Sequence, residues 1–167
     1  MDDRFAIHAW SNDQRIAQMT GQPFSQRYRE RVLANRGALL DSGPATLALT
    51  AVSQVAPGEE LGALEAIQTA RYVHGSDTTA QAVLAQLLRD KGLAAAASRL
   101  EASSDELRDA ASARMNAGKA LLRSVGVSGV PTLVSYQDSG LQLRPVPSEL
   151  LYGRDDELLR HLGLATS

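Results

Sequence analysis

The segment from Ser124 to Tyr136, SVGVSGVPTLVSY, constrains the fold more than any other part of the sequence. A long helical pattern ends there and a β-branched segment begins. Proline cannot continue a helix, because it lacks the N–H and its ring clashes with the preceding turn. Glycine allows another segment to approach the backbone closely. Gly129 and Pro131 therefore predict a turn between a helix and a strand, and a plain loop at this point is the simpler alternative.

Apolar residues recur at helical spacing through most of the chain, which predicts a mostly α-helical protein. The stripe from Asp105 to Val125 is the longest, with Ala111 and Gly118 on a face that another backbone could approach. Turn signals containing glycine or proline separate the stripes. Helices are expected from residue 11 or 12 to 19, from 25 onward, and over 45–55, 61–75, 83–91, 93–100, 105–125 and 155–162.

Three short segments are typical of β-strands. Thr132–Tyr136 and Leu141–Arg144 flank a turn at 138–140 and predict a β-hairpin. Near the N-terminus, alternation over Phe5–Trp10 predicts a short strand, so residues 1–10 are expected to hold a residual strand. The predicted fold class is mostly α with a small β-sheet.

At 167 residues the chain is long enough for one domain with a sizeable core, or for a small domain with a large insertion. Its 17 basic and 19 acidic residues are spread along the chain and give a net charge of −2, which argues against nucleic acid or a membrane as a partner. The N-terminal sequence lacks the basic start and apolar stretch of a signal peptide, and no run approaches the roughly 18 apolar residues of a membrane span. We therefore expect a cytoplasmic protein.

The sequence contains no cysteine. Disulfides, thiolate catalysis, zinc–thiolate sites and iron–sulfur clusters are therefore excluded for these residues. His8, His74 and His161 lack the spacing of a helical metal site, and the acidic residues at 155–157 are explained by the dipole of a helix N-terminus. No phosphate-binding glycine loop or serine-nucleophile elbow occurs. We predict no catalytic residue, no metal site and no cofactor.

Four stretches of the sequence are informative together: RIAQMTGQPFSQRY at 15–28, LDSGPATLA at 40–48, AIQTARYVHG at 66–75 and the VSGVPT turn at 127–132. They resemble the DsbA-like branch of the thioredoxin superfamily, in particular its predicted protein-disulfide-isomerase subgroup. The order of elements resembles such a protein from its second strand onward, over roughly residues 12–162. The resemblance implies a partial thioredoxin-like fold, with a large helical insertion, or lid, at 11–103 and a C-terminal β-β-α half with its preceding helix at 104–167.

The chemistry of this family needs a thiolate at a helix N-terminus and a second thiol that resolves the mixed disulfide. Neither group occurs here, and the family's first strand and C-x-x-C helix have no counterpart before Ser11. The resemblance does imply a peptide-docking edge, where the backbone before a cis-proline pairs with an extended substrate. Val130 and Pro131 are therefore the expected substrate-binding residues, and Pro131 is expected to be cis.

Two functional classes remain open. In the first, the chain is a truncated or wrongly started thiol-disulfide oxidoreductase, redox-inactive as given, and an in-frame C-x-x-C in the upstream DNA would support it. In the second, the chain is a non-catalytic peptide- or protein-binding module that uses the cis-proline edge and the helical lid. Glutathione-dependent chemistry ranks last, because no glutathione site is recognisable.

The missing first strand has a further consequence. In this superfamily it lies inside the sheet, beside the strand that follows the cis-proline. Its absence is expected to expose an apolar strand edge, which tends to recruit another chain. We therefore predict a homodimer or a domain-swapped oligomer, with Phe5–Trp10 helping to cover the gap. Elution as a compact monomer would contradict this prediction.

Overall fold

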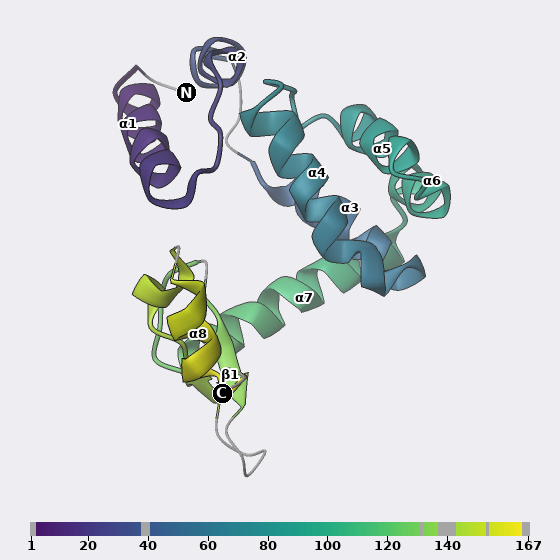
Figure 1. The fold of residues 1–167 in the computed structure, drawn as a ribbon. Helices are drawn as coiled ribbons and strands as arrows, with labels where there is room; N and C mark the ends of the chain where they lie inside the picture. The colour runs from purple at the N-terminus through teal and green to yellow at the C-terminus, as the bar shows by residue number, and fades with distance from the viewer. Residues whose placement is uncertain (1–2, 38–40, 131, 137–142, 153, 165–167) are drawn as a thin grey trace. The chain divides into compact units, whose positions relative to one another are not determined.

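The computed structural model describes residues 3–37, 41–130, 132–136, 143–152 and 154–164. The chain forms two compact units, Met1–Ser112 and Ala113–Ser167, and the boundary lies within the long helix α7 (Asp105–Ser124). Figure 1 shows the elements of each unit. The expected division before residue 104, between a lid and a thioredoxin-like half, precedes this helix and stays a prediction.

An N-terminal helix, α1 (Asp3–Thr20), takes the place of the predicted strand. The strand predicted over Phe5–Trp10 is therefore wrong, and so is the residual strand within residues 1–10 as far as these are described. The alternation there covered too few residues to distinguish a period of two from one of 3.6. Ala6, Ala9 and Trp10 follow helical spacing and pack together against buried residues of the next segment.

The next segment begins with one α-helical turn, α2 (Gln26–Tyr28), and continues as the π-helix η1 (Arg29–Leu33). The predicted start near Ser25 is confirmed, since Ser25 Oγ accepts a hydrogen bond from the Tyr28 N–H at 3.1 Å. The Ala34 N–H donates to the Arg29 carbonyl at 2.9 Å, five residues back, which widens the turn. Tyr28 and Leu33 are buried and anchor this segment against α1.

Four helices surround the main hydrophobic core of the first unit: α3 (Gly43–Val55), α4 (Glu60–Tyr72), α5 (Gln81–Asp90) and α6 (Ala94–Ala102). A 3-10 turn, η2 (Pro57–Glu59), precedes α4. Leu84, Leu88, Leu100 and Leu107 are buried at its centre, and most of the other core residues are alanines or valines. All four helices were predicted to within a few residues at each end, α4 and α5 from apolar stripes, α3 from the turn and proline before it, and α6 from its alanine-rich sequence.

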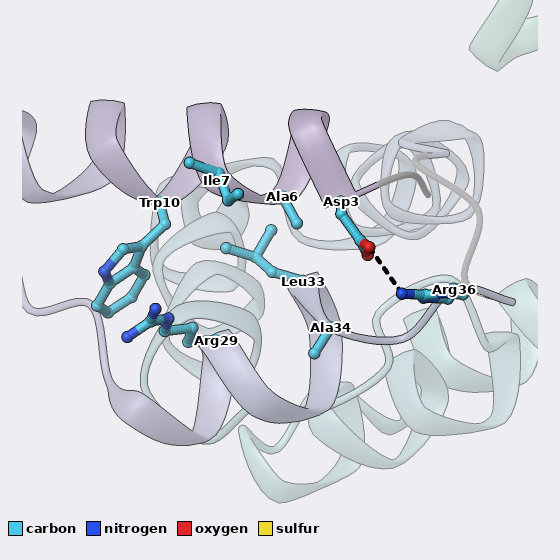
Figure 2. A pocket seen from close by; sticks show the side chains of 8 residues that line it. All are labelled: Asp3, Ala6, Ile7, Trp10, Arg29, Leu33, Ala34 and Arg36. Atoms are coloured by element: carbon cyan, nitrogen blue, oxygen red, sulfur yellow. Dashed lines mark hydrogen bonds and ion pairs between the residues drawn. The ribbon is translucent and has the colours of Figure 1, made fainter.

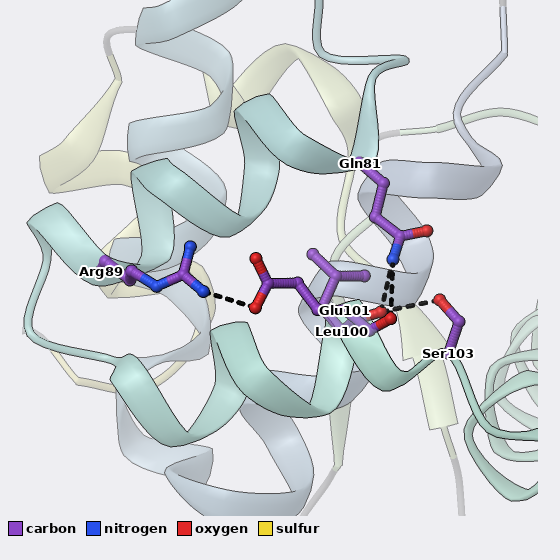
Figure 3. A network of polar contacts seen from close by, with 5 residues as sticks. All are labelled: Gln81, Arg89, Leu100, Glu101 and Ser103. Carbon is purple, nitrogen blue, oxygen red and sulfur yellow. Dashed lines mark hydrogen bonds and ion pairs between the residues drawn. The ribbon is translucent and has the colours of Figure 1, made fainter.

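A hydrogen bond and an ion pair join α5 to α6 at the margin of this core (Figure 3). Gln81 Nε2 and Ser103 Oγ both donate to the Leu100 carbonyl, each at 2.7 Å, and Arg89 forms an ion pair with Glu101. Carbonyls in the last turn of a helix have no intrahelical partner, so these donors satisfy the end of α6. Ser103 itself has a φ of +43°, the left-handed conformation that ends many helices.

The second unit holds the rest of α7, the strands β1 (Val134–Tyr136) and β2 (Leu143–Pro145), the 3-10 turn η3 (Ser148–Leu151) and the helix α8 (Asp155–His161). The two strands pair antiparallel, which confirms the hairpin, and the predicted turn at 138–140 lies outside the described residues. A Cβ on Gly118 would meet no heavy atom within 4 Å, so no described backbone approaches this glycine closely.

The fold class is therefore the predicted one, mostly α-helical with a small β-sheet. Among the helices in the described ranges, none is both long and apolar enough to cross a membrane.

Candidate functional site

The predicted peptide-docking residues, Val130 and Pro131, precede β1 by a few residues in the sequence. The side chain of Val130 is 83% exposed. Pro131 lies outside the described residues, so its cis geometry and the docking role of both residues stay predictions. The Thr132 hydroxyl donates to the Gly129 carbonyl at 2.6 Å, which closes a turn directly ahead of the strand. An exposed apolar side chain, Val130, thus lies four residues before the start of β1.

One edge of β1 pairs with β2, and the other has no strand partner among the described residues. The Leu133 carbonyl accepts the Val146 N–H at 2.8 Å, so the backbone of Leu133 faces β2. Successive residues of an antiparallel pair direct their backbone groups to alternate edges. The N–H and C=O groups of Val134 and Tyr136 therefore face the open edge of β1.

The outer edge of β2 is protected against pairing, whereas the open edge of β1 is not. Pro145 stands opposite Val134, at a position whose backbone nitrogen faces outward, and proline has no N–H to offer there. Arg144 adds a charged side chain to β2. Proline and charge are two common means by which edge strands avoid pairing, and Leu133–Tyr136 contains neither.

The side chains around the open edge are apolar and exposed. Leu133 is 38% exposed and Tyr136 is 73% exposed, in addition to Val130. An edge of this kind offers main-chain hydrogen bonds together with apolar surface, which is the combination that an added strand uses.

A pocket of about 470 Å³ lies between α1 and η1 (Figure 2). Its lining residues are Asp3, Ala6, Ile7, Trp10, Arg29, Leu33, Ala34 and Arg36. The charges in it are matched internally: Arg29 Cζ lies 5.3 Å from the centroid of the Trp10 ring, and Arg36 pairs with Asp3 at 2.7 Å. Both partners of the ion pair are largely exposed, so the pair contributes about 1 kcal/mol or less. Sequence reasoning missed this pocket because it assigned a strand to its α1 side.

A cluster of aromatic rings joins the elements beside this pocket. Tyr28 meets Tyr72 edge-on with ring centroids 5.1 Å apart, and Phe24 lies at the same distance from Tyr72. The Tyr28 hydroxyl donates to Asp13 Oδ2 at 3.0 Å. Burial raises the pKa of Asp13, although this hydrogen bond and the charge of Arg71 oppose the rise. Burial, and then the Asp13 charge, also raises the pKa of Tyr28, so its hydroxyl stays a donor.

The substitution Asp13→Asn is expected to change how stability depends on pH. Because folding raises the pKa of Asp13 above its ordinary 3.8, the folded state holds this proton more tightly than the unfolded state does. Ionisation of Asp13 therefore lowers stability as the pH rises from 3.8 through the raised pKa. The variant lacks this loss, and its amide oxygen can still accept the Tyr28 hydroxyl. Its free energy of unfolding, relative to the original chain, should increase across that window in urea titrations.

Asp77→Asn provides a control of opposite sign. Hydrogen bonds from the Thr79 side chain and backbone lower the pKa of Asp77, so its ionisation stabilises the folded state, and this contribution is lost as the pH falls through the lowered pKa. The relative stability of D77N should therefore decrease as the pH rises. If the relative stabilities of D13N and D77N change in the same direction with pH, one of the two assignments is wrong.

No group of three His, Asp or Glu side chains is placed to hold a metal ion within the part of the chain that the structure describes. His8 Nε2 lies 3.0 Å from Asn12 Nδ2, one helical turn away on α1.

A mostly helical chain in which a long helix leads into an antiparallel hairpin and a last helix has the architecture of a partial thioredoxin-like fold with a large helical insertion. No family model and no curated protein matches the chain. Among solved structures, the cytosolic disulfide reductase DsbM from Pseudomonas aeruginosa is similar, with a TM-score of 0.81 and 31% identity over 96% of this chain and 78% of that one.

Two further structures agree with this match. DsbM solved with GSH has a TM-score of 0.76 and 30% identity over 91% of this chain and 72% of that one. A candidate protein disulfide isomerase from Nitrosomonas europaea has a TM-score of 0.76 and 28% identity over 97% of this chain and 73% of that one. The chain belongs to the DsbA-like branch of the thioredoxin superfamily, and its lineage is that of disulfide oxidoreductases.

Proposed function

We propose that this chain is a redox-inactive member of the disulfide oxidoreductase lineage that binds an extended peptide along the open edge of β1. Thiol-disulfide exchange requires a thiolate that attacks one sulfur and a second thiol that releases the product. The sequence contains no cysteine, so its 167 residues hold no sulfur nucleophile. Peptide binding, in contrast, requires only main-chain groups and apolar surface.

The observation that supports this function best is the contrast between the two edges of the hairpin. Val134 and Tyr136 direct their backbone groups to an edge with no described strand partner, whereas Pro145 blocks the opposite edge. An extended peptide that pairs with Val134 would place its side chains near the exposed Val130 and Tyr136. Pro131, expected to be cis, would end this docking edge at its N-terminal side.

The test uses a fluorescein-labelled, C-terminally amidated insulin B chain with alkylated cysteines. This probe is unfolded and carries no free thiol, so fluorescence anisotropy reports binding alone. Val134→Pro removes an N–H that faces the open edge and places a ring against an incoming strand. Affinity is expected to fall by about tenfold or more, because each lost hydrogen bond corresponds to about 1 kcal/mol and the ring adds a clash.

Leu143→Pro is the matched control. Leu143 stands opposite Tyr136, so its N–H faces outward from β2, on the protected edge. Both substitutions insert a proline at an outward position of the same hairpin, and L143P is expected to keep the affinity. Circular dichroism serves to check that both variants stay folded. Equal affinity of V134P and the original chain, or a loss in L143P alone, would overturn the proposal.

Pro131→Ala tests the residue itself. If a cis-proline shapes the docking edge, this variant binds the B-chain probe less tightly, and unchanged binding would remove Pro131 from the site.

A homodimer or domain-swapped oligomer that uses the same edge would compete with the probe. Affinity would then decrease as the concentration of the protein increases, in step with dimer formation measured by light scattering.

A second candidate function is glutathione binding, which one similar structure favours because it is DsbM solved with GSH. Isothermal titration with glutathione distinguishes the two candidates. If glutathione gives the same heat of binding with V134P as with the original chain, its site does not include the β1 edge. Absence of heat at millimolar glutathione would remove this candidate.

A further inference from the structure

The first unit contains a second pocket, formed by the start of α3, the C-terminal half of α4 and the segment that follows it. Its volume is about 430 Å³, within the roughly 300–1,000 Å³ typical of small-molecule sites. Ala45, Leu64 and Ile67 line it with apolar surface. Among its described lining residues, Arg71 is the one cation and Asp41 the one carboxylate.

The surrounding structure holds Arg71 in place. It lies in the last turn of α4, next to Tyr72, whose ring is fixed in the aromatic cluster. After α4 the chain turns at Gly75 and brings the buried Thr78 back to the pocket. Arg71 Nη1 donates a long hydrogen bond, 3.4 Å, to Thr78 Oγ1. Arg71 is partly buried as a residue, and this hydrogen bond positions its guanidinium.

The charge of Arg71 has no ion-pair partner among the described residues. Two carboxylates lie near enough to respond to it, and both are bonded elsewhere: Asp13 accepts from Tyr28, and Asp77 accepts from Thr79. A guanidinium has five N–H donors in a planar fork that matches a carboxylate. One donor makes the long hydrogen bond to Thr78, so the others can donate to the carboxylate of a ligand.

Asp41 supplies the opposite charge in the same pocket. Its Oδ1 accepts the Gly43 N–H at 2.8 Å, which fixes the carboxylate at the start of α3. Its Oδ2 has no described partner. A dianion such as phosphate would meet one arginine together with the nearby carboxylates Asp41 and Asp77, so it is disfavoured. A ligand with one positive and one negative end matches the pocket better.

We propose that this pocket binds a zwitterionic dipeptide with apolar side chains, its carboxylate on Arg71, its amino group on Asp41 and its side chains against Ala45, Leu64 and Ile67. The pocket belongs to the first unit and β1 to the second, and the proposal does not depend on the function proposed for the β1 edge.

The experiment compares three ligands by isothermal titration: Leu-Leu, N-acetyl-Leu-Leu and Leu-Leu-amide. They share the apolar body, and the second and third each lack one charge. Leu-Leu is expected to bind, and each blocked form is expected to bind at least about fivefold more weakly, in line with about 1 kcal/mol or more for a charge-assisted hydrogen bond. Equal binding of all three ligands, or no binding of Leu-Leu at millimolar concentration, overturns the proposal.

Variants assign each charge to its residue. Arg71→Gln should lower the affinity for Leu-Leu to that for Leu-Leu-amide and leave the affinity for the amide unchanged. Asp41→Asn should lower the affinity for Leu-Leu to that for N-acetyl-Leu-Leu and leave the affinity for the N-acetyl form unchanged. Arg29→Gln, in the pocket between α1 and η1, is the matched control and should bind Leu-Leu as the original chain does. The assignment is contradicted if R29Q has a lower affinity for Leu-Leu but not for the blocked forms, or if R71Q keeps the full affinity for Leu-Leu.

The pocket and the β1 edge can be tested independently of each other. R71Q should still bind the amidated B-chain probe, and V134P should still bind Leu-Leu. Loss of Leu-Leu in V134P would mean that the dipeptide occupies the β1 edge, and it would overturn the pocket while leaving the edge in place.

Discussion

Gly75→Ala is expected to lower the free energy of unfolding by about 2–4 kcal/mol, the sum of backbone strain and overpacking. Gly75 has a φ of +65°, where a residue with a Cβ is strained. A Cβ at this position would lie 2.7 Å from the Arg27 carbonyl oxygen and 2.9 Å from the carbonyl carbon. Both are backbone atoms, so no side-chain rotation relieves the contact. Relief requires α2 to move away from the end of α4.

Such a movement would disturb specific bonds. The Ser25 N–H donates to the Tyr72 carbonyl at 2.9 Å, and Ser25 Oγ donates to the Val73 carbonyl at 2.6 Å. These bonds and the ring contact between Tyr28 and Tyr72 join α2 to α4. Urea unfolding followed by far-ultraviolet circular dichroism measures the loss.

Gly92→Ala is a control that distinguishes the effect of the contact with Arg27 from the effect of backbone strain at a positive φ. Gly92 has a similar φ of +78°, but a Cβ there would meet nothing within 4 Å. Only the strain remains, so the expected loss is about 1 kcal/mol. If the free energy of unfolding falls by the same amount in G75A and G92A, the contact with the Arg27 backbone does not contribute to the effect of G75A.

Leu100→Ala is expected to lower the free energy of unfolding by about 2–5 kcal/mol, the usual range for truncating a buried leucine. Leu100 is fully buried between α6 and its neighbours in the main core. The substitution leaves the carbonyl of residue 100 in place, so the bonds from Gln81 and Ser103 persist. The loss therefore reports apolar contact and the cavity left behind.

Leu61→Ala is the matched control for Leu100. Leu61 lies on α4 and is 80% exposed, so removing the same atoms should change stability by only about 0.5 kcal/mol or less. Thermal unfolding of both variants gives the comparison. A loss in L61A that approaches that of L100A would show that Leu61 is covered in solution by another surface.

Helices with several turns of apolar stripe were predictable from the sequence. The stripe from Asp105 to Val125 gave α7, and the stripe with Val83 and Leu88 gave α5, because burial of one face imposes a period of 3.6 over many residues. The hairpin was also predictable, since two short strand-like segments flank the turn signal at 138–140. The segment Phe5–Trp10 was not, because six residues fit either period.

The candidate site was predictable only in part. The resemblance gave Val130 and Pro131 as an expected docking edge, and the structure adds which backbone groups of β1 face outward. That assignment depends on the register of Leu133 and Val146, a pairing between strands that no local pattern specifies. The Arg71 pocket was not predicted. Asp41 and Arg71 lie in two of the stretches that carry the family resemblance, but no residue spacing indicates that these stretches line one pocket.

By itself, the sequence determined the helical periods, the turn chemistry of Gly129 and Pro131, and the absence of any thiol, because these depend on residue type and short-range spacing. Only the tertiary structure decided which edge of β1 is open and that Asp41 and Arg71 line one pocket, because both depend on contacts between segments far apart in the chain.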